Sequence, residues 1–123
     1  MKLSKVFSKE INVNIGTHRQ LEKLFPDIER IIKTIHKKIK LGGKLMLCGN
    51  GGSAADAQHL SAEFLVRLRP NINRNPIPAI SLAQDTSMLT ACGNDYSFSD
   101  VFRRPFQALV KKKRCVNCNY NFR

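Results

Sequence analysis

The chain has 123 residues, a length that suits one domain with one hydrophobic core. Hydrophobic residues make up 42% of it, which excludes a largely disordered protein. No apolar run is long enough to cross a bilayer, so we expect no membrane partner. The first residues are basic but lack the apolar run of a signal peptide, and we therefore expect a cytoplasmic protein.

The net charge of +12 first points to nucleic acid. Five of the 21 basic residues lie in the last thirteen positions, which hold no acid, so sixteen basic and nine acidic residues leave a net charge of +7 in residues 1–110. A second cluster, residues 33–44, belongs to the polar side of one expected helix. Because no aromatic residues are interleaved with these lysines, we expect a solvated face and no nucleic-acid partner.

The first 43 residues predict helices. Residues 1–16 have only a weak helical pattern, which Gly16 interrupts, and Thr17 can cap a short helix that stops at Pro26. A second helix is expected to start at Asp27 and to end at Gly42-Gly43, because glycine is the preferred left-handed cap. Its apolar stripe has helical spacing and consists of Ile28, Ile31, Ile32, Ile35 and Ile39.

The rest of the chain alternates between strands and helices. In chain order we expect a strand over 44–48, a glycine turn over 49–53, a helix over 53–68, a loop over 69–76, a strand over 77–82, a helix capped by Asp85 or Thr86 and broken at Asn94-Asp95, and a helix over 98–110. This order predicts the α/β class, with a doubly wound, flavodoxin-like parallel sheet that is truncated after its second strand. Cys48 and Cys92 are expected to be reduced core residues, and the Cys115/Cys118 pair is weak evidence for zinc.

The glycine turn predicts a seat for an anion. It joins a strand to a helix N-terminus, where backbone N–H groups and the helix dipole favour negative charge. Asn50, Gly51, Gly52 and Ser53 form it, and the Ser53 hydroxyl is a candidate phosphate ligand. The alternative is that Ser53 only caps the helix. The spacing matches neither the dinucleotide fingerprint nor the P-loop, so a nucleotide is not indicated.

The helix after the turn has a polar stripe with three- and four-residue steps. Glu63 could act as a general base near a bound sugar phosphate, and His59 with Glu63 could share a metal ion. The alternatives are a structural histidine and a surface Glu63–Arg67 salt bridge. A second polar group, including Asp85, Thr86 and Asp95, follows the second strand. Asp85 and Thr86 are expected at the same sheet edge as the turn, unless they are only caps.

Two motif blocks identify a family resemblance. CGNGGSAADAQHLSAEFLVR (48–67) and PAISLAQDTSMLTACGND (78–95) resemble the phosphoheptose isomerases of the sugar isomerase (SIS) domain superfamily. The resemblance implies conversion of sedoheptulose 7-phosphate into glycero-manno-heptose 7-phosphate, on the pathway to the heptose of lipopolysaccharide or capsule. It also implies a homotetramer with active sites between subunits. A relative in the superfamily is instead a binding protein of the replication initiator, and the carboxylate of Glu63 favours the isomerases.

The resemblance also implies residue roles. Glu63 matches the catalytic base, and His59 with Glu63 matches two ligands of the zinc found in some members. The substrate and phosphate positions are Asn50, Gly51, Gly52, Ser53, Arg67 and Asp95.

The resemblance ends near Lys112. The family continues with a strand, a serine-rich phosphate loop, and a later helix that supplies a glutamine and a histidine acid. Codons compatible with residues 114–123, read one base later, encode Asp-Val-Leu-Ile-Ala-Ile-Thr-Thr-Ser-Gly, which is that strand and loop. We therefore expect residues 1–110 to be the N-terminal part of one SIS domain, residues 111–123 to be a frameshifted basic tail, and the chain to be inactive by itself.

Overall fold

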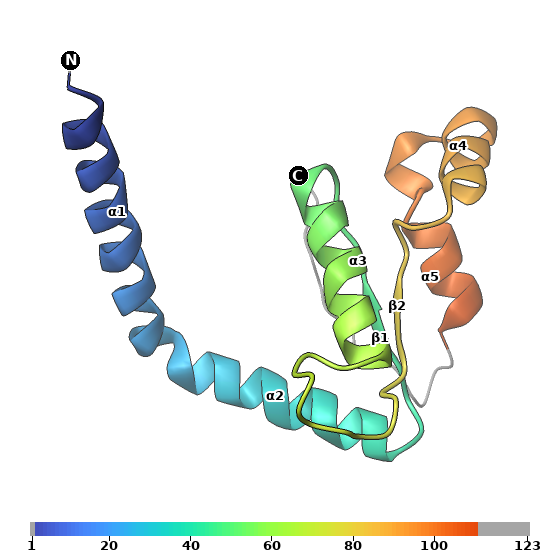
Figure 1. Ribbon diagram of the computed structural model, residues 1–123. Coiled ribbons are helices and arrows are strands. Elements are labelled where there is room, and N and C mark those ends of the chain that lie inside the picture. Colours follow the sequence, from blue (N-terminus) through green and yellow to red (C-terminus); the bar gives the residue numbers. More distant parts are fainter. Residues whose placement is uncertain (1, 111–123) are drawn as a thin grey trace. The chain divides into compact units, whose positions relative to one another are not determined.

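The computed structural model describes residues 2–110. The chain divides into two compact units, residues 1–34 and 35–123. Three helical elements start it: α1 (Leu3–Gln20), the 3-10 helix η1 (Leu21–Leu24) and α2 (Phe25–Lys40), the last of which runs from the first unit into the second (Figure 1). The Cys115/Cys118 pair and the predicted frameshifted tail lie outside the described residues.

Three expectations for the N-terminal helices are wrong. The helix α1 continues through Gly16, because a single glycine costs only about 1 kcal/mol in a helix interior. Thr17 does not cap a helix, since its hydroxyl donates to the Val13 carbonyl at 3.0 Å within α1. The helix α2 starts two residues before Asp27 and includes Pro26, which is tolerated in the first turn because no N–H is needed there.

The second unit contains the sheet. The strands β1 (Leu45–Leu47) and β2 (Ala79–Ser81) pair in parallel, with Met46 opposite Ile80. Gly42 precedes β1 with a φ of 75°, and its amide bonds the Ile39 carbonyl at 2.9 Å, so the predicted glycine end of α2 is confirmed. Both predicted strands are confirmed, although each has only three residues.

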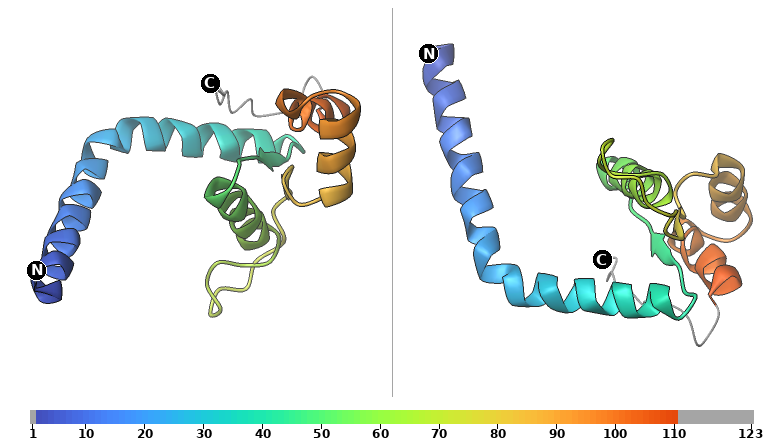
Figure 2. Two further views of the ribbon diagram at one scale, coloured as in Figure 1. Left: turned by 90° about the horizontal axis from the view of Figure 1, so that it is seen from above. Right: turned by 60° about the horizontal axis from the view of Figure 1, so that its bottom comes forward.

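Helices lie on both sides of this strand pair. The helix α3 (Gly52–Leu65) connects β1 to β2 on one side, and α4 (Thr86–Asp95) and α5 (Arg103–Leu109) lie on the other side in all views (Figures 1 and 2). The 3-10 helix η2 (Phe98–Asp100) joins the latter two. This arrangement confirms the α/β class and the doubly wound plan with two parallel strands.

The predicted helix over 98–110 is wrong as one element. A helix continuous from Phe98 would need the Val101 carbonyl to accept an N–H from residue 105, and Pro105 has none. The chain instead forms η2 and then α5, where Pro105 falls in the first turn. Similarly, α3 ends at Leu65 and not at residue 68.

The core lies between the strands and these helices. Its buried hydrophobic residues are Leu45, Met46, Ala57, Ala79, Leu82, Ala83, Cys92 and Val101. Cys92 is therefore the core residue that the sequence predicts, whereas Cys48 is only half-buried, because it lies beyond the last residue of β1. Between residues 2 and 110, no helix is both long and apolar enough to traverse a bilayer.

Candidate active site

The glycine turn after β1 is shaped by two of its glycines. A Cβ at Gly49 would lie 2.6 Å from the backbone carbon and oxygen of Ser53, so only glycine fits under the first turn of α3. Gly51, the N-cap residue of α3, has a φ of 55°, a conformation that glycine adopts at little cost. The chain thereby reverses from strand to helix within a few residues.

Gly52 and Ser53 occupy the open side of the turn. A Cβ built on Gly52 meets no atom within 4 Å, so space remains beside the helix start. The N-cap residue of α3 is Gly51, and Ser53 is the second residue of the helix, so Ser53 does not occupy the capping position. The Ser53 amide itself donates to the Asn50 carbonyl at 3.0 Å, so this amide is engaged within the turn and the exposed hydroxyl is the group that Ser53 presents.

His59 and Glu63 lie side by side on α3, as their spacing predicts. The distance from His59 Nε2 to Glu63 Oε1 is 3.5 Å. The Glu63 side chain is only 23% exposed, whereas that of His59 is 73% exposed. Glu63 Oε2 is buried and accepts no hydrogen bond from residues 2–110. Since buried carboxylate oxygens are nearly always paired, this atom marks a place where a ligand or another chain segment would supply a donor.

The pair does not make a complete zinc site. Structural and catalytic zinc ions take at least three protein ligands. Within residues 2–110, no group of three or more His, Cys, Asp or Glu side chains could hold a metal ion. The unpaired Oε2 atom of Glu63 is suited to bind a cation. His59 and Glu63 alone, however, are too few ligands for a zinc ion. The zinc that the resemblance implies therefore does not fit the described residues by themselves.

Arg67 does not pair with Glu63. It lies beyond the end of α3, is exposed, and donates to the Pro70 carbonyl at 2.9 Å. Arg74, which the sequence analysis missed, instead contacts the end of α3. It donates to the backbone carbonyls of Glu63 and Phe64 at 2.5 and 2.9 Å. No local pattern reveals this contact, because it joins residues ten and eleven positions apart across an irregular loop.

A second missed contact links α3 to the segment after β2. Gln58 donates through Nε2 to the Ala83 carbonyl at 2.9 Å. Asp85 follows and accepts a hydrogen bond from the Met88 amide at 3.0 Å, which confirms its predicted capping of α4. The carboxyl ends of both strands therefore lead into helix starts, which is the arrangement of ligand sites in open α/β sheets.

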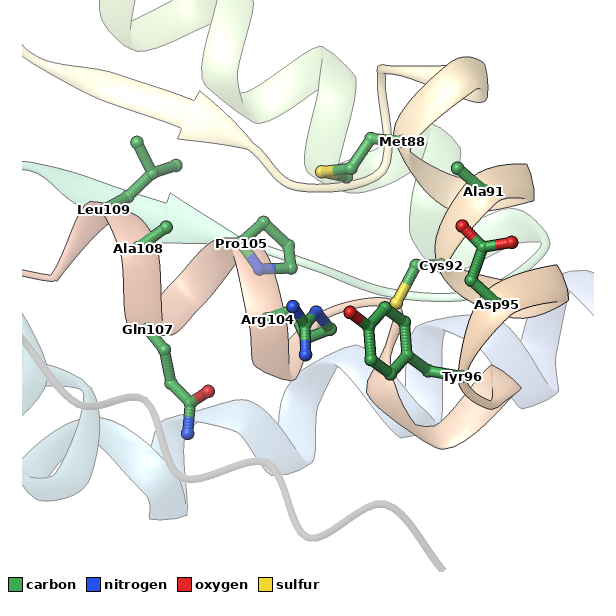
Figure 3. A pocket seen from close by; sticks show the side chains of 10 residues that line it. All are labelled: Met88, Ala91, Cys92, Asp95, Tyr96, Arg104, Pro105, Gln107, Ala108 and Leu109. Carbon is green, nitrogen blue, oxygen red and sulfur yellow. The ribbon is translucent and has the colours of Figure 1, made fainter.

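Asp95 lies in a different place from the glycine turn. It is the last residue of α4 and accepts a hydrogen bond from Asn94 at 2.9 Å. It lines an open, mostly apolar hollow of about 620 Å³ between α4 and α5, and no residue of the turn lines this hollow (Figure 3). Arg104 stacks there on the Tyr96 ring, 3.7 Å from its centroid, a contact that the sequence analysis also missed.

Comparison with known proteins now places the chain in a family. A model of the SIS domain matches residues 12–114, which is most of the chain, so the chain belongs to the SIS domain family. Phosphoheptose isomerases are among the proteins to which it is similar. The one from Roseiflexus sp. strain RS-1 is 48% identical over 101 residues, and the one from Aquifex aeolicus is 44% identical over 108 residues.

Solved structures agree with these relatives. The phosphoheptose isomerase GmhA from Neisseria gonorrhoeae matches with a TM-score of 0.73 at 34% identity, over 89% of this chain and 56% of that chain. A phosphoheptose isomerase from Francisella tularensis matches with a TM-score of 0.73 at 33% identity. The match to the Roseiflexus protein covers 81% of this chain and 50% of that protein. The chain thus spans about half the length of the relatives it matches.

Proposed function

We propose that this chain carries the phosphate-binding turn and the base of a sugar-phosphate isomerase that acts on sedoheptulose 7-phosphate. The main support for this proposal is the Glu63 carboxylate. It is largely buried, one of its oxygens has no partner among the described residues, and it lies on the helix that starts at the glycine turn. The similarity to phosphoheptose isomerases supports this class of reaction, and the helix N-terminus after the turn is a favourable position for a phosphate.

The proposed chemistry is proton transfer between adjacent carbons. Glu63 removes the proton from the hydroxyl-bearing carbon next to the carbonyl of the opened sugar, which gives an enediolate, and returns it to the former carbonyl carbon. The hydroxyl proton passes to the former carbonyl oxygen as the new carbonyl forms. A positioned general base of this kind contributes about 10²–10⁴ in rate. The phosphate would occupy the open space beside Gly52, near the Ser53 hydroxyl and the positive end of the α3 dipole.

Three further residues complete the proposed substrate contacts. Asn50 belongs to the turn, Arg67 to the segment after α3, and Asp95 to the end of α4. Because Asp95 lines the hollow between α4 and α5, its contact would be with a part of the substrate away from the phosphate, or with a substrate held by another subunit.

The wider setting is also part of the proposal. We place the enzyme in the cytoplasm, in heptose synthesis for lipopolysaccharide or capsule, and as a homo-oligomer, a tetramer as in the family. Exposed apolar residues on α1 and α2, such as Phe7 and Ile32, are available for subunit contacts. If zinc binds, His59 and Glu63 would hold it together with ligands from outside the described residues. No step of the proposed reaction depends on this ion.

We further propose that these 123 residues by themselves do not turn over substrate. They hold no counterpart of the serine-rich phosphate loop or of the later histidine acid that the family uses. We attribute the end of the resemblance to a frameshift near Lys111–Lys113, with residues 1–110 as the N-terminal part of one SIS domain. Sequencing of the gene tests this: the expected result is a second frame that encodes the strand and loop, and its absence would refute the frameshift.

The decisive experiment for function is a comparison of base variants. In a gene with the reading frame restored, Glu63→Gln should lower kcat for sedoheptulose 7-phosphate by about 10²–10⁴, because the amide cannot accept the proton. Glu29→Gln, which changes an exposed glutamate of α2, is the matched control and should leave kcat unchanged. Turnover by Glu63→Gln at the parental rate would refute the proposed role of the carboxylate.

A further inference from the structure

The C-terminal end of α3 lacks the usual glycine. A helix leaves its last carbonyls without intrahelical partners, and a left-handed glycine often provides the bonds that satisfy them. After Leu65 the chain continues with Val66, Arg67 and Leu68, none of which is glycine. The Val66 amide bonds the Ala62 carbonyl at 2.8 Å. The carbonyls of Glu63 and Phe64 must therefore find partners elsewhere.

Arg74 supplies these partners from the loop that follows. Its Nη2 donates to the Glu63 carbonyl at 2.5 Å, and its Nη1 donates to the Phe64 carbonyl at 2.9 Å. Nη1 also donates to the Asn75 carbonyl in its own loop at 3.0 Å. A planar guanidinium can contact two successive carbonyls at once, and its positive charge is favourable at the negative end of the helix dipole.

The C-terminal end of α3 is also hydrogen-bonded to the segment that leads into β2. The Ile77 amide donates to the Phe64 carbonyl at 3.0 Å, two residues before β2 begins at Ala79. Arg74 is half-buried, so its hydrogen bonds are shielded from competing water better than those of an exposed arginine. The guanidinium thereby fixes the last turn of α3 against the segment that enters the sheet.

Glu63 lies in that last turn, two residues before α3 ends. Its backbone carbonyl is held by Arg74 while its Oε2 atom is buried without a partner. We propose that Arg74 is a positioning residue for Glu63: by holding the two carbonyls at the end of α3, it sets where the carboxylate stands. The consequence for catalysis rests on the proposed isomerase function, but the positioning itself does not.

The test follows the Glu63 carboxyl group in the 123-residue chain. The chain has four glutamates, Glu10, Glu22, Glu29 and Glu63, so carboxyl-labelled glutamate gives few NMR resonances, and Glu63→Gln identifies the one that belongs to Glu63. In Arg74→Ala this resonance should be displaced or broadened. The Ile77 amide should exchange with solvent on the order of tenfold faster, because its acceptor is no longer held.

Two variants isolate the role of the paired hydrogen bonds. Arg69→Ala removes the same charge from the same loop, and the Arg69 side chain makes no hydrogen bond within residues 2–110, so the Glu63 resonance should stay in place. Arg74→Lys keeps the charge but offers one donor nitrogen in place of the two that contact the Glu63 and Phe64 carbonyls, so its Glu63 resonance should lie nearer to that of Arg74→Ala than to the parent. Protection of the Leu45 and Leu82 amides, which bond across the strand pair, reports that each variant is folded.

An unmoved Glu63 resonance in both Arg74 variants would overturn the positioning role, and so would an equal displacement in Arg69→Ala. The readout needs no turnover. A failed isomerase assay would therefore count against the proposed function alone, whereas an unmoved resonance would count against Arg74 alone. If Arg74→Ala does not fold, the Arg74→Lys comparison decides the question in the same way.

Discussion

Three neighbouring glycines in the turn have different physical roles. Gly49 is required by space, because Ser53 leaves no room for a side chain above it. Gly51 is required by conformation, since its φ is 55°. Gly52 is required by neither, because its φ is ordinary and a Cβ would meet open space. The lack of a structural need at Gly52 is consistent with the proposal that a phosphate uses this space.

Alanine substitutions should separate these roles. Gly49→Ala should lower the free energy of unfolding by roughly 1–3 kcal/mol, because the added methyl group overlaps the α3 backbone. Gly52→Ala should be neutral or stabilising by up to about 1 kcal/mol, because alanine favours the helix. In urea titrations, equal destabilisation by the two substitutions would contradict the structure. Gly52→Ala should also weaken binding of inorganic phosphate, if the phosphate occupies the proposed space.

At the scale of elements, an acidic side chain organises the turn before α5. Asp100 Oδ1 accepts from Arg103 Nε at 2.6 Å, and Asp100 Oδ2 accepts from the Ser97 hydroxyl at 3.0 Å. The Arg103 hydrogen bond first, and the Ser97 hydroxyl second, hold the pKa of Asp100 below 3.8, its ordinary value. The charged form of Asp100 therefore favours the folded state.

The pH dependence of this contribution has a defined sign. A lowered folded-state pKa gives stability that is present above pH 3.8 and is lost as the pH falls through the folded-state value. Asp100→Asn should thus lower Tm near neutral pH, and the difference from the parent should vanish at pH values below 3.8. Thermal melts over that range, with the exposed Asp56→Asn as control, measure it. A difference that persists unchanged in acid would exclude the ionised carboxylate as the cause.

At the scale of the whole molecule, buried and exposed apolar surface are unevenly distributed. Among residues 2–110, the buried hydrophobic residues lie from Leu45 to Val101, and α1, η1 and α2 contain none. Several large apolar side chains of these three helices are exposed, including Leu3, Phe7, Phe25 and Ile32. Exposed apolar surface on neighbouring helices favours association, which supports the proposed homo-oligomer.

Association should therefore depend on these helices. The chain should form oligomers whose fraction rises with protein concentration, as measured by size-exclusion chromatography with light scattering. Phe7→Lys with Ile32→Lys should shift it toward the monomer, because both side chains are mostly exposed in the single chain and would be buried in a contact. Lys9→Gln, an exposed change on α1, should not. A chain that is monomeric at all concentrations would contradict the proposal.

Features set by neighbouring residues could be predicted from the sequence. The glycine turn, the Gly42 helix end and the Asp85 cap each depend on contacts within a few positions, so residue type and spacing suffice to find them. The two strands pair with each other at long range, but each is marked locally by a short apolar run. The errors arose where a local signal competed with a longer pattern. The low helix propensity of Gly16 did not interrupt α1. The missing N–H of Pro105, in contrast, divided the predicted helix over 98–110 into two elements.

The amino-acid sequence alone determined the α/β plan, the family resemblance, and the pairing of His59 with Glu63, because these follow from periodicity and from motifs read along the chain. Only the tertiary structure decided that Arg74 holds the end of α3, that Gln58 bonds the Ala83 carbonyl, and that Asp95 lines a hollow apart from the glycine turn. Each of these depends on the path of a connecting segment, and the direction in which a loop returns is set by packing between distant residues.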